Sequence, residues 1–408
     1  MSARVVIVGG GPAGLTAAAA LAPSAEVLVL EREAETGGIP RHSDHPGYGM
    51  RDLHRFLSGP AYARRLTERA RDAGATLETE AMVTGWTAGR ALEVTSPRGR
   101  RVITADAIVL ATGARERPRP ARLIPGDRPD GVYPTGQLQN LVHLHHREVG
   151  ARAVVLGAEP VSWSAVLTLR RAGCRTVLMT TEYEKSESYA AFRAFGTAVL
   201  GVPVRPRSRV VAIHGKRRVT SVDVEDLDTG ERRRVPCDTV ITTGDWIPDH
   251  ELARTGGLEM DRGTRGPRVD TALRTSVPGV FAAGNLLHPV DTADVAALDG
   301  RHVARAVSEH LSRGGPPAHG LELAVDAPLR WVAPQLFEPG GPPPARGHLL
   351  LRCDVFRTFP AVTATQNGRP LGTARPPWPA APGRVFRVPY SVLADADPTA
   401  GPVRLTLR

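Results

Sequence analysis

The chain has 408 residues, of which 41% are hydrophobic and 23% are charged. This is the composition of a folded protein of two or three domains, and it excludes a mainly disordered chain and a disulfide-stapled miniprotein. The formal net charge is +10, but Lys185 and Lys216 are the only lysines and the arginines are scattered among acids. This pattern is typical of a solvated surface, so we expect no nucleic-acid partner.

The first predicted element is a strand, a glycine turn and a helix within residues 5–25. This stretch carries no charge, but four glycines and a proline stand in its first ten residues, so we expect no membrane span. An aliphatic run at residues 5–8 precedes Gly9, Gly11 and Gly14, and an Ala-rich helix follows. The three glycines form a GxGxxG motif, which allows a tight turn, a close approach of pyrophosphate and close helix–strand packing.

A second strand, residues 27–30, ends in Glu31, which is 22 positions beyond Gly9. A carboxylate in this place is typical of a group that binds the ribose of a dinucleotide. The free N–H groups and the positive dipole at the helix N-terminus would then meet the phosphates. The residues by themselves predict FAD or NAD here.

A second strand–turn–helix unit opens at residue 153. The template glycines of its turn fall at Gly157, Glu159 and Ser162. Glu159 would bring a negative charge to the place where pyrophosphate must touch the backbone, and Pro160 removes one donor. We therefore expect the fold of a nucleotide domain here, with NAD(P)H binding doubtful.

Each of the two units is followed later by a strand that ends in a Thr-Gly pair, at residues 107–113 and 239–244. A further strand at 280–283 leads into a helix at about 292–311. The alternation predicts an α/β fold with a largely parallel sheet. The expected architecture is two nested, three-layer Rossmann-like dinucleotide-binding domains, an FAD-binding domain at 1–125 and 255–314 and an NAD(P)-binding-like domain at 126–254.

The composition changes after residue 314, since residues 315–408 hold 17 of the 36 prolines. Asn367-Gly368 is a hairpin turn signal between two of the short β-type runs. We predict a small C-terminal β-sandwich-like module over 315–408, and the alternative is a disordered Pro-rich tail. The β-type runs are at 329–332, 348–356, 361–366, 384–388 and 403–407.

The three cysteines, Cys174, Cys237 and Cys353, are far apart in sequence. No CxxC pair and no zinc or iron–sulfur spacing exists, so we predict no metal site and no local redox dithiol. Scattered cysteines fit a reducing compartment, and we expect a cytoplasmic protein.

Two later segments point to FAD by resemblance. Residues 107–114 and 275–285 resemble the ATG and GxxxxAGD motifs of flavoproteins with two dinucleotide-binding domains. In that family the last carboxylate holds a ribityl hydroxyl of FAD, and Asn285 stands in its place here. An amide can still donate and accept a hydrogen bond, so the role survives without the charge.

A narrower resemblance lies in four blocks, residues 37–42, 45–52, 59–66 and 284–293. They are similar to the larger FAD subunits of heteromeric amine and amino-acid oxidising enzymes, namely opine oxidase, hydrogen cyanide synthase, dye-linked proline dehydrogenase and heterotetrameric sarcosine oxidase. The resemblance runs from residue 1 to about 313. It implies a small-molecule substrate with a C–N bond beside a carboxylate, hydride transfer to flavin N5 and a second oxidoreductase subunit or an electron-acceptor protein. The chain departs from several members because it lacks their cysteine cluster.

The predicted site residues follow from these motifs. In this fold the chain after Glu31 runs along the pyrophosphate towards the flavin ring, so His42, His45 and Tyr48 are the catalytic candidates. The alternative is a polar loop whose histidines cap backbone groups. The predicted FAD-binding residues are Gly9, Gly11, Pro12, Ala13, Gly14, Glu31, Arg32, Gly38, Ile39, Val83, Ala111, Thr112, Gly113, Gly284, Asn285 and Thr292.

The helix that starts near Thr292 is expected to point its N-terminus at the flavin, and the alternative role of this end is ordinary N-capping by Asp291. The leading functional hypothesis is an FAD-dependent oxidoreductase acting on an amine, imino acid or amino-acid-derived substrate. One alternative is an NAD(P)H-dependent flavoprotein reductase without a redox disulfide. Another is a flavin electron-transfer subunit that does no substrate chemistry.

Overall fold

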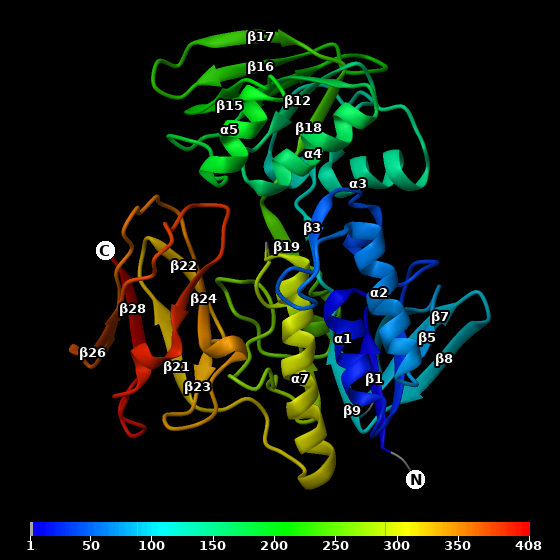
Figure 1. Cartoon of the computed structure of the whole chain (residues 1–408), viewed down its shortest axis with the longest axis vertical. Helices are drawn as coiled ribbons and strands as arrows, with labels where there is room; N and C mark the ends of the chain where they lie inside the picture. The colour runs from blue at the N-terminus through cyan, green and yellow to red at the C-terminus, as the bar shows by residue number, and fades with distance from the viewer. Residues whose placement is uncertain (1–2, 88, 290) are drawn as a thin grey trace. The chain divides into compact units, whose positions relative to one another are not determined.

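The computed structural model describes residues 3–87, 89–289 and 291–408, without the side chains of residues 191–193 and 195. The chain divides into two compact units, whose elements are labelled in Figure 1. Met1–Arg41, Gly47–Ala114 and Ile247–Arg408 form the first unit, and His42–Pro46 with Arg115–Trp246 form the second. Within the described part of the chain, no helix has both the length and the apolar character needed to cross a bilayer.

The first unit is built on a five-stranded parallel sheet in the order β20-β9-β1-β2-β5. The strands β1, β2 and β9 are mostly aliphatic and buried, as expected for parallel strands covered on both faces, whereas the edge strand β5 is not. They are β1 (Arg4–Val8), β2 (Glu26–Leu30), β5 (Thr76–Glu78), β9 (Ala107–Leu110) and β20 (Val280–Ala282).

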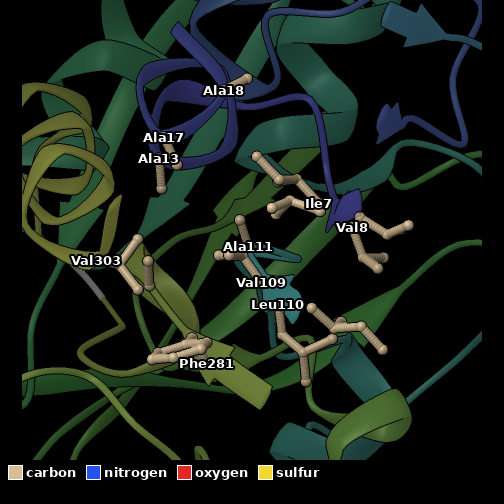
Figure 2. Packing of buried hydrophobic residues seen from close by; sticks show 14 of the residues in the cluster. Ile7, Val8, Ala13, Ala17, Ala18, Val109, Leu110, Ala111, Phe281 and Val303 are labelled. Carbon is tan, nitrogen blue, oxygen red and sulfur yellow. The ribbon is translucent and has the colours of Figure 1, made fainter. Parts of the chain in front are cut away.

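Helices α1 (Pro12–Leu21) and α7 (Ala293–Arg313) pack tightly against each other. A Cβ atom at Gly300 would lie 2.1 Å from the carbonyl oxygen of Ala13, so only glycine permits this approach. Figure 2 shows Ala13 and Ala17 of α1, Val303 of α7 and Phe281 of β20 in the same hydrophobic core. The helix α2 (Gly59–Asp72) buries one face and is capped by Ser58, whose hydroxyl accepts from the Ala61 N–H.

The remaining elements of the first unit are short. An antiparallel sheet consists of β6 (Met82–Thr87), β7 (Ala91–Ser96) and β8 (Gly99–Thr104). The others are β4 (Leu57–Ser58), α6 (Glu251–Thr255) and η4 (Gly284–Leu286). Four of the described elements span a boundary between the two units, namely η1 (Ile39–His42), β3 (Pro46–Tyr48), β10 (Ala114–Glu116) and β19 (Trp246–Pro248).

The second unit repeats the parallel arrangement with the strand order β11-β18-β12-β13-β14. These strands are β11 (Val132–Pro134), β12 (Arg152–Leu156), β13 (Arg175–Thr180), β14 (Val204–Arg205) and β18 (Thr239–Thr242). An antiparallel sheet adds β15 (Ser208–His214), β16 (Ser221–Asp226) and β17 (Arg232–Pro236). The helices are α3 (Thr135–Gln139), α4 (Pro160–Arg171) and α5 (Ala190–Ala198). The predicted α/β class with two Rossmann-like sheets is confirmed.

The C-terminal β module, residues 315–408, is folded and belongs to the first unit. Its two sheets, β23-β21-β28-β25-β26 and β22-β24-β27, enclose a hydrophobic core of their own. Asn367 and Gly368 have φ values of 48° and 80° and close the β25–β26 hairpin as predicted. The strands are β21 (Leu321–Val325), β22 (Leu329–Ala333), β23 (Leu336–Phe337), β24 (His348–Cys353), β25 (Val362–Gln366), β26 (Arg369–Ala374), β27 (Phe386–Pro389) and β28 (Val403–Leu407).

The module is joined to the rest of the first unit through backbone bonds at Val269. The Val269 N–H donates to the Gln335 side chain at 3.1 Å, and the Val269 carbonyl accepts from the N–H groups of Gln335 and Leu336. An ion pair of 3.2 Å between Arg268 and Glu322 lies beside them. Because Val269 and Gln335 are buried and their polar groups satisfy one another, the module packs on the rest of the first unit.

Candidate functional site

The first glycine turn joins β1 to α1. Gly9 has a φ of +109°, and a Cβ atom there would lie 2.4 Å from the Ala111 carbonyl oxygen. A Cβ atom at Gly14 would lie 2.0 Å from the Gly9 carbonyl oxygen. Gly11 is different, since a Cβ atom there would have only the Gly38 Cα within 4 Å, at 3.9 Å. Gly9 and Gly14 are therefore required by the fold, whereas Gly11 leaves an open face at the start of α1.

Glu31 lies at the end of β2 and is 7% exposed. Its two carboxylate oxygens accept from the Gly10 N–H at 2.8 Å and the Glu33 N–H at 2.9 Å. The carboxylate therefore sits beside the glycine turn, as predicted from the spacing. The Glu31 carbonyl also accepts from the Ala81 N–H, which brings the start of β6, with the half-buried Val83, towards this strand end.

The segment 111–113 follows β9 and lies next to the same turn. The Ala111 N–H donates to the Val8 carbonyl at 2.8 Å, and the Thr112 hydroxyl donates to the Asp249 carbonyl at 2.7 Å. Asp249 also pairs with Arg32 at 2.9 Å. Sequence reasoning missed this link, because 217 residues separate Arg32 from Asp249 and no local pattern marks the pair.

Gly284 and Asn285 lie where β20 ends and η4 begins. Gly284 has a φ of +74°, and a Cβ atom there would lie 2.8 Å from the Ala13 side chain on α1. The Asn285 amide donates to the Asp291 carbonyl at 2.9 Å, while its buried oxygen Oδ1 has no hydrogen-bond partner. Buried polar oxygens are normally satisfied, so an orphaned acceptor points to a missing donor such as a hydroxyl of a bound molecule.

The N-terminus of α7 follows Asn285 closely. Thr292 occupies the N-cap position with extended backbone angles, so the alternative of N-capping by Asp291 is wrong. The Asp291 carboxylate instead accepts from the Thr292 N–H at 2.8 Å. Asp294 in the first turn is 3% exposed and pairs with Arg51 at 3.2 Å.

The residues present fit FAD. The open face at Gly11 and the free N–H groups of the helix behind it suit a pyrophosphate, since an anion is favoured at a helix N-terminus. The Glu31 carboxylate suits ribose hydroxyls, and the orphaned Asn285 oxygen suits a ribityl hydroxyl. Asn285 would thus accept the hydrogen bond that a carboxylate accepts in the motif it resembles.

The catalytic candidates are distributed over the two units. Gly37 donates its N–H to the Gly10 carbonyl at 2.7 Å, and Gly38 has a φ of +62° and faces Gly11. His42 is buried and belongs to the second unit, as does the half-buried His45. Tyr48 belongs to the first unit, where its ring lies 5.8 Å from that of Tyr62.

Two other predicted residues are accounted for as follows. Ile39, at the start of η1, is 48% exposed and Pro12 is the first residue of α1, a position at which a missing N–H costs nothing.

Burial lowers the pKa of His45, although its ring Nδ1 lies 2.9 Å from the Pro46 carbonyl. His45 is therefore neutral near pH 7, the form that can accept a proton.

The second glycine turn joins β12 to α4 and is filled by the chain itself. Glu159 occupies the N-cap position of α4 and is 4% exposed. A Cβ atom at Gly157 would lie 2.6 Å from one Glu159 carboxylate oxygen, and one at Gly244 would lie 3.0 Å from the other, which has no hydrogen-bond partner. Ser162 replaces the third glycine and its hydroxyl lies 2.6 Å from that of Thr243.

The three cysteines are all free and buried. Burial raises the pKa of Cys174 to about 11 and that of Cys237 to about 12, and it also raises the pKa of Cys353. Because the thiolate is the reactive form, none of these thiols is poised to exchange electrons with a disulfide.

Comparison with protein families settles the wider relationship. The family model for pyridine nucleotide-disulphide oxidoreductases matches residues 3–300. The chain belongs to this family. The predicted FAD-dependent oxidoreductase is thereby confirmed in its general class, and the C-terminal β module lies beyond the matched region.

Relatives within the family differ in what they are named for. A thioredoxin reductase of Treponema pallidum is 29% identical over 79% of this chain and 97% of its own length. An opine oxidase subunit of Agrobacterium tumefaciens is 26% identical over 75% of this chain and 65% of its own length. Among solved structures, the T. acidophilum thioredoxin reductase has a TM-score of 0.63 at 22% identity, covering 75% of this chain and 98% of its own. At this identity the structural likeness shows the fold alone.

Proposed function

We propose that this protein oxidises a C–N bond in an amine, an imino acid or an amino-acid-derived substrate, as one subunit of a hetero-oligomer. Bound FAD supplies the acceptor for the hydride that leaves the carbon next to nitrogen. The chain's own contribution is to hold the dinucleotide at the β1–α1 turn, with Glu31 at the ribose, Asn285 at the ribityl chain and the α7 N-terminus towards the ring.

The observation that carries the proposal is the filled second turn. A nicotinamide dinucleotide needs backbone access for its pyrophosphate, and the buried Glu159 carboxylate lies between Gly157 and Gly244 instead. Two negative groups a few ångströms apart repel each other strongly at a buried site. The filled turn supports a flavin that takes its electrons from an organic substrate rather than from a nicotinamide, and the buried cysteines offer no disulfide as the acceptor.

The choice of a C–N substrate and of a partner protein is supported by the opine oxidase relative and by the four sequence blocks described above. The substrate's amine must be neutral before hydride leaves, and His42, His45 and Tyr48 are the candidates that the sequence offers for accepting its proton. A cytoplasmic location fits three reduced cysteines.

The test is anaerobic mixing of the purified flavoprotein with a panel of secondary amines and amino acids, monitored at the flavin absorption band. Bleaching by a panel member supports the proposal. The T. pallidum relative favours a second candidate function, an NAD(P)H-dependent reductase, which predicts bleaching by NADPH or NADH instead. Bleaching only when a partner protein is added would identify an electron-transfer subunit.

A further inference from the structure

Two buried carboxylates of the flavin half of the chain find their counter-charges in the C-terminal β module. Asp291, in the loop between η4 and α7, has a side chain that is 5% exposed and lies 3.5 Å from Arg387 of β27. Asp299, on α7, has a side chain that is 4% exposed and lies 3.8 Å from Arg346 of η5 (Ala345–Gly347). Both arginines come from sequence beyond the matched family region.

Asp291 connects the module to the proposed ribityl contact in two steps. The Arg387 guanidinium faces the Asp291 side chain, and the Asp291 carbonyl accepts from the Asn285 amide at 2.9 Å. That bond turns the Asn285 amide so that Oδ1 stays buried and without a partner. The same Asp291 side chain holds the N–H of Thr292, the N-cap of α7. The position of Arg387 therefore affects both the orientation of the Asn285 amide and the N-cap of α7.

The second ion pair, Asp299 with Arg346, reaches the same loop through His288. His288 is buried and hydrogen-bonds the Asp299 carboxylate through Nε2. Burial by itself lowers the pKa of His288, but the Asp299 carboxylate outweighs it, so the pKa is raised. Burial raises the pKa of Asp299, but His288 and Arg346 outweigh it, so the pKa is lowered. The pair is held in its charged form, with Arg346 as the module's contribution.

A buried charge without its partner is costly, because desolvation is no longer offset by attraction. If Arg387 were lost, the Asp291 carboxylate would keep the Thr292 N–H but no cation, and the loop would relieve this cost by moving Asp291 towards water. Such a movement would carry Asn285 and the start of α7 with it. If Arg346 were lost, Asp299 would keep His288 as its partner, so the effect should be smaller.

We propose that the C-terminal β module is a clamp on the loop between η4 and α7, which carries Asp291. In this role Arg387 and Arg346 are positioning residues that hold Asn285 and the α7 N-terminus in their FAD-binding arrangement. The module thus serves cofactor retention. This inference concerns FAD affinity and stands whether or not the substrate is an amine.

The experiment measures FAD affinity rather than activity. Apo-protein is prepared from the full chain, and flavin fluorescence quenching gives the dissociation constant, with the flavin absorption spectrum recorded alongside. We expect R387A to weaken FAD binding about tenfold or more and to shift the flavin band, and R346A to act in the same direction with a smaller effect. R387K should recover part of the affinity. The double variant D291N/R387Q leaves no buried charge unpaired and keeps an oxygen for the Thr292 N–H, so it should fold. Because it lacks the ion pair to the module, it should still bind FAD more weakly than the wild type.

The matched control is R404A, which breaks an exposed Arg404–Asp326 pair inside the module at 2.6 Å and should leave the affinity unchanged. Wild-type affinity and spectrum in both R387A and R346A would overturn the clamp. Should R387A fail to refold, the neutral double variant decides the matter. Weaker FAD binding by that variant than by R404A supports the clamp, and wild-type affinity contradicts it.

Discussion

The two glycine turns of this molecule start from the same strand–turn–helix plan and end in opposite states. At β1–α1 the buried carboxylate is Glu31, which stands beside the turn and has both oxygens satisfied by backbone N–H groups. At β12–α4 the buried carboxylate is Glu159, which stands inside the turn with one oxygen unsatisfied. The difference shows that a nucleotide-binding fold can be retained while a side-chain carboxylate occupies the position where a pyrophosphate would bind.

The largest difference in stability between the two turns is expected at the third glycine position, which is Gly14 in the first turn and Ser162 in the second. Gly14→Ala would drive a methyl group to 2.0 Å from the Gly9 carbonyl, so the β1–α1 unit must distort. We expect a loss of about 3 kcal/mol or more in the free energy of unfolding, and no FAD in the purified protein. The matched change Ser162→Ala removes only the bond to Thr243 and should cost about 1 kcal/mol. Denaturant titration compares the two, and equal losses would contradict the distinction between the turns.

The middle glycine separates cofactor binding from folding. Gly11 has a φ of −84°, which any residue adopts, and a Cβ atom there meets nothing closer than 3.9 Å. Gly11→Ala should therefore leave the unfolding free energy of the apo-protein within about 1 kcal/mol of the wild type. Because the methyl group occupies the face offered to pyrophosphate, FAD affinity should fall about tenfold or more. Unchanged FAD affinity in fluorescence titration would show that the pyrophosphate lies elsewhere.

Emptying the second turn should move it towards the first. In the double variant Glu159→Gly with Ser162→Gly, both intruding side chains are gone and α4 regains an open N-terminus. We expect saturable binding of NADPH or NADH to appear in calorimetry on the holoprotein of this variant, under conditions in which the wild type shows none. Ser162→Gly alone is the control and should leave nicotinamide binding unchanged, since Glu159 remains. No gain in the double variant would mean that Glu159 is not the obstacle.

The smallest effect is expected at the thiols. Burial keeps Cys174, Cys237 and Cys353 protonated at neutral pH, so an aromatic disulfide reagent should label none of them in the native protein. All three should react after denaturation. A fast-reacting native thiol would contradict the account of three buried, protonated cysteines.

Much of the fold was predictable because local sequence patterns determine it. The aliphatic runs at β1, β9 and β12, the glycine turns and the Asn367-Gly368 hairpin each specify their own backbone. In the module, β21, β23 and β26 were not predicted. They are fixed by pairing with other strands, β21 with β28, β23 with β21, and β26 with β25.

The site was predictable where the motif is local and unpredictable where it depends on distant partners. The placement of Glu31 followed from its distance to Gly9, and the filling of the second turn followed from Glu159. No spacing rule could connect Arg387 with Asp291, because 96 residues and a separate sheet lie between them. Long-range ion pairs leave no periodic trace in a sequence.

The central claim is that one turn receives a dinucleotide and the other holds the chain's own carboxylate. It is tested most directly by calorimetric titration of the wild-type holoprotein with NADPH and NADH, with FAD titrated into the apo-protein as the reference. The account predicts tight saturable binding of FAD and no saturable binding of either nicotinamide. Micromolar binding of NADPH or NADH to the wild type would contradict it.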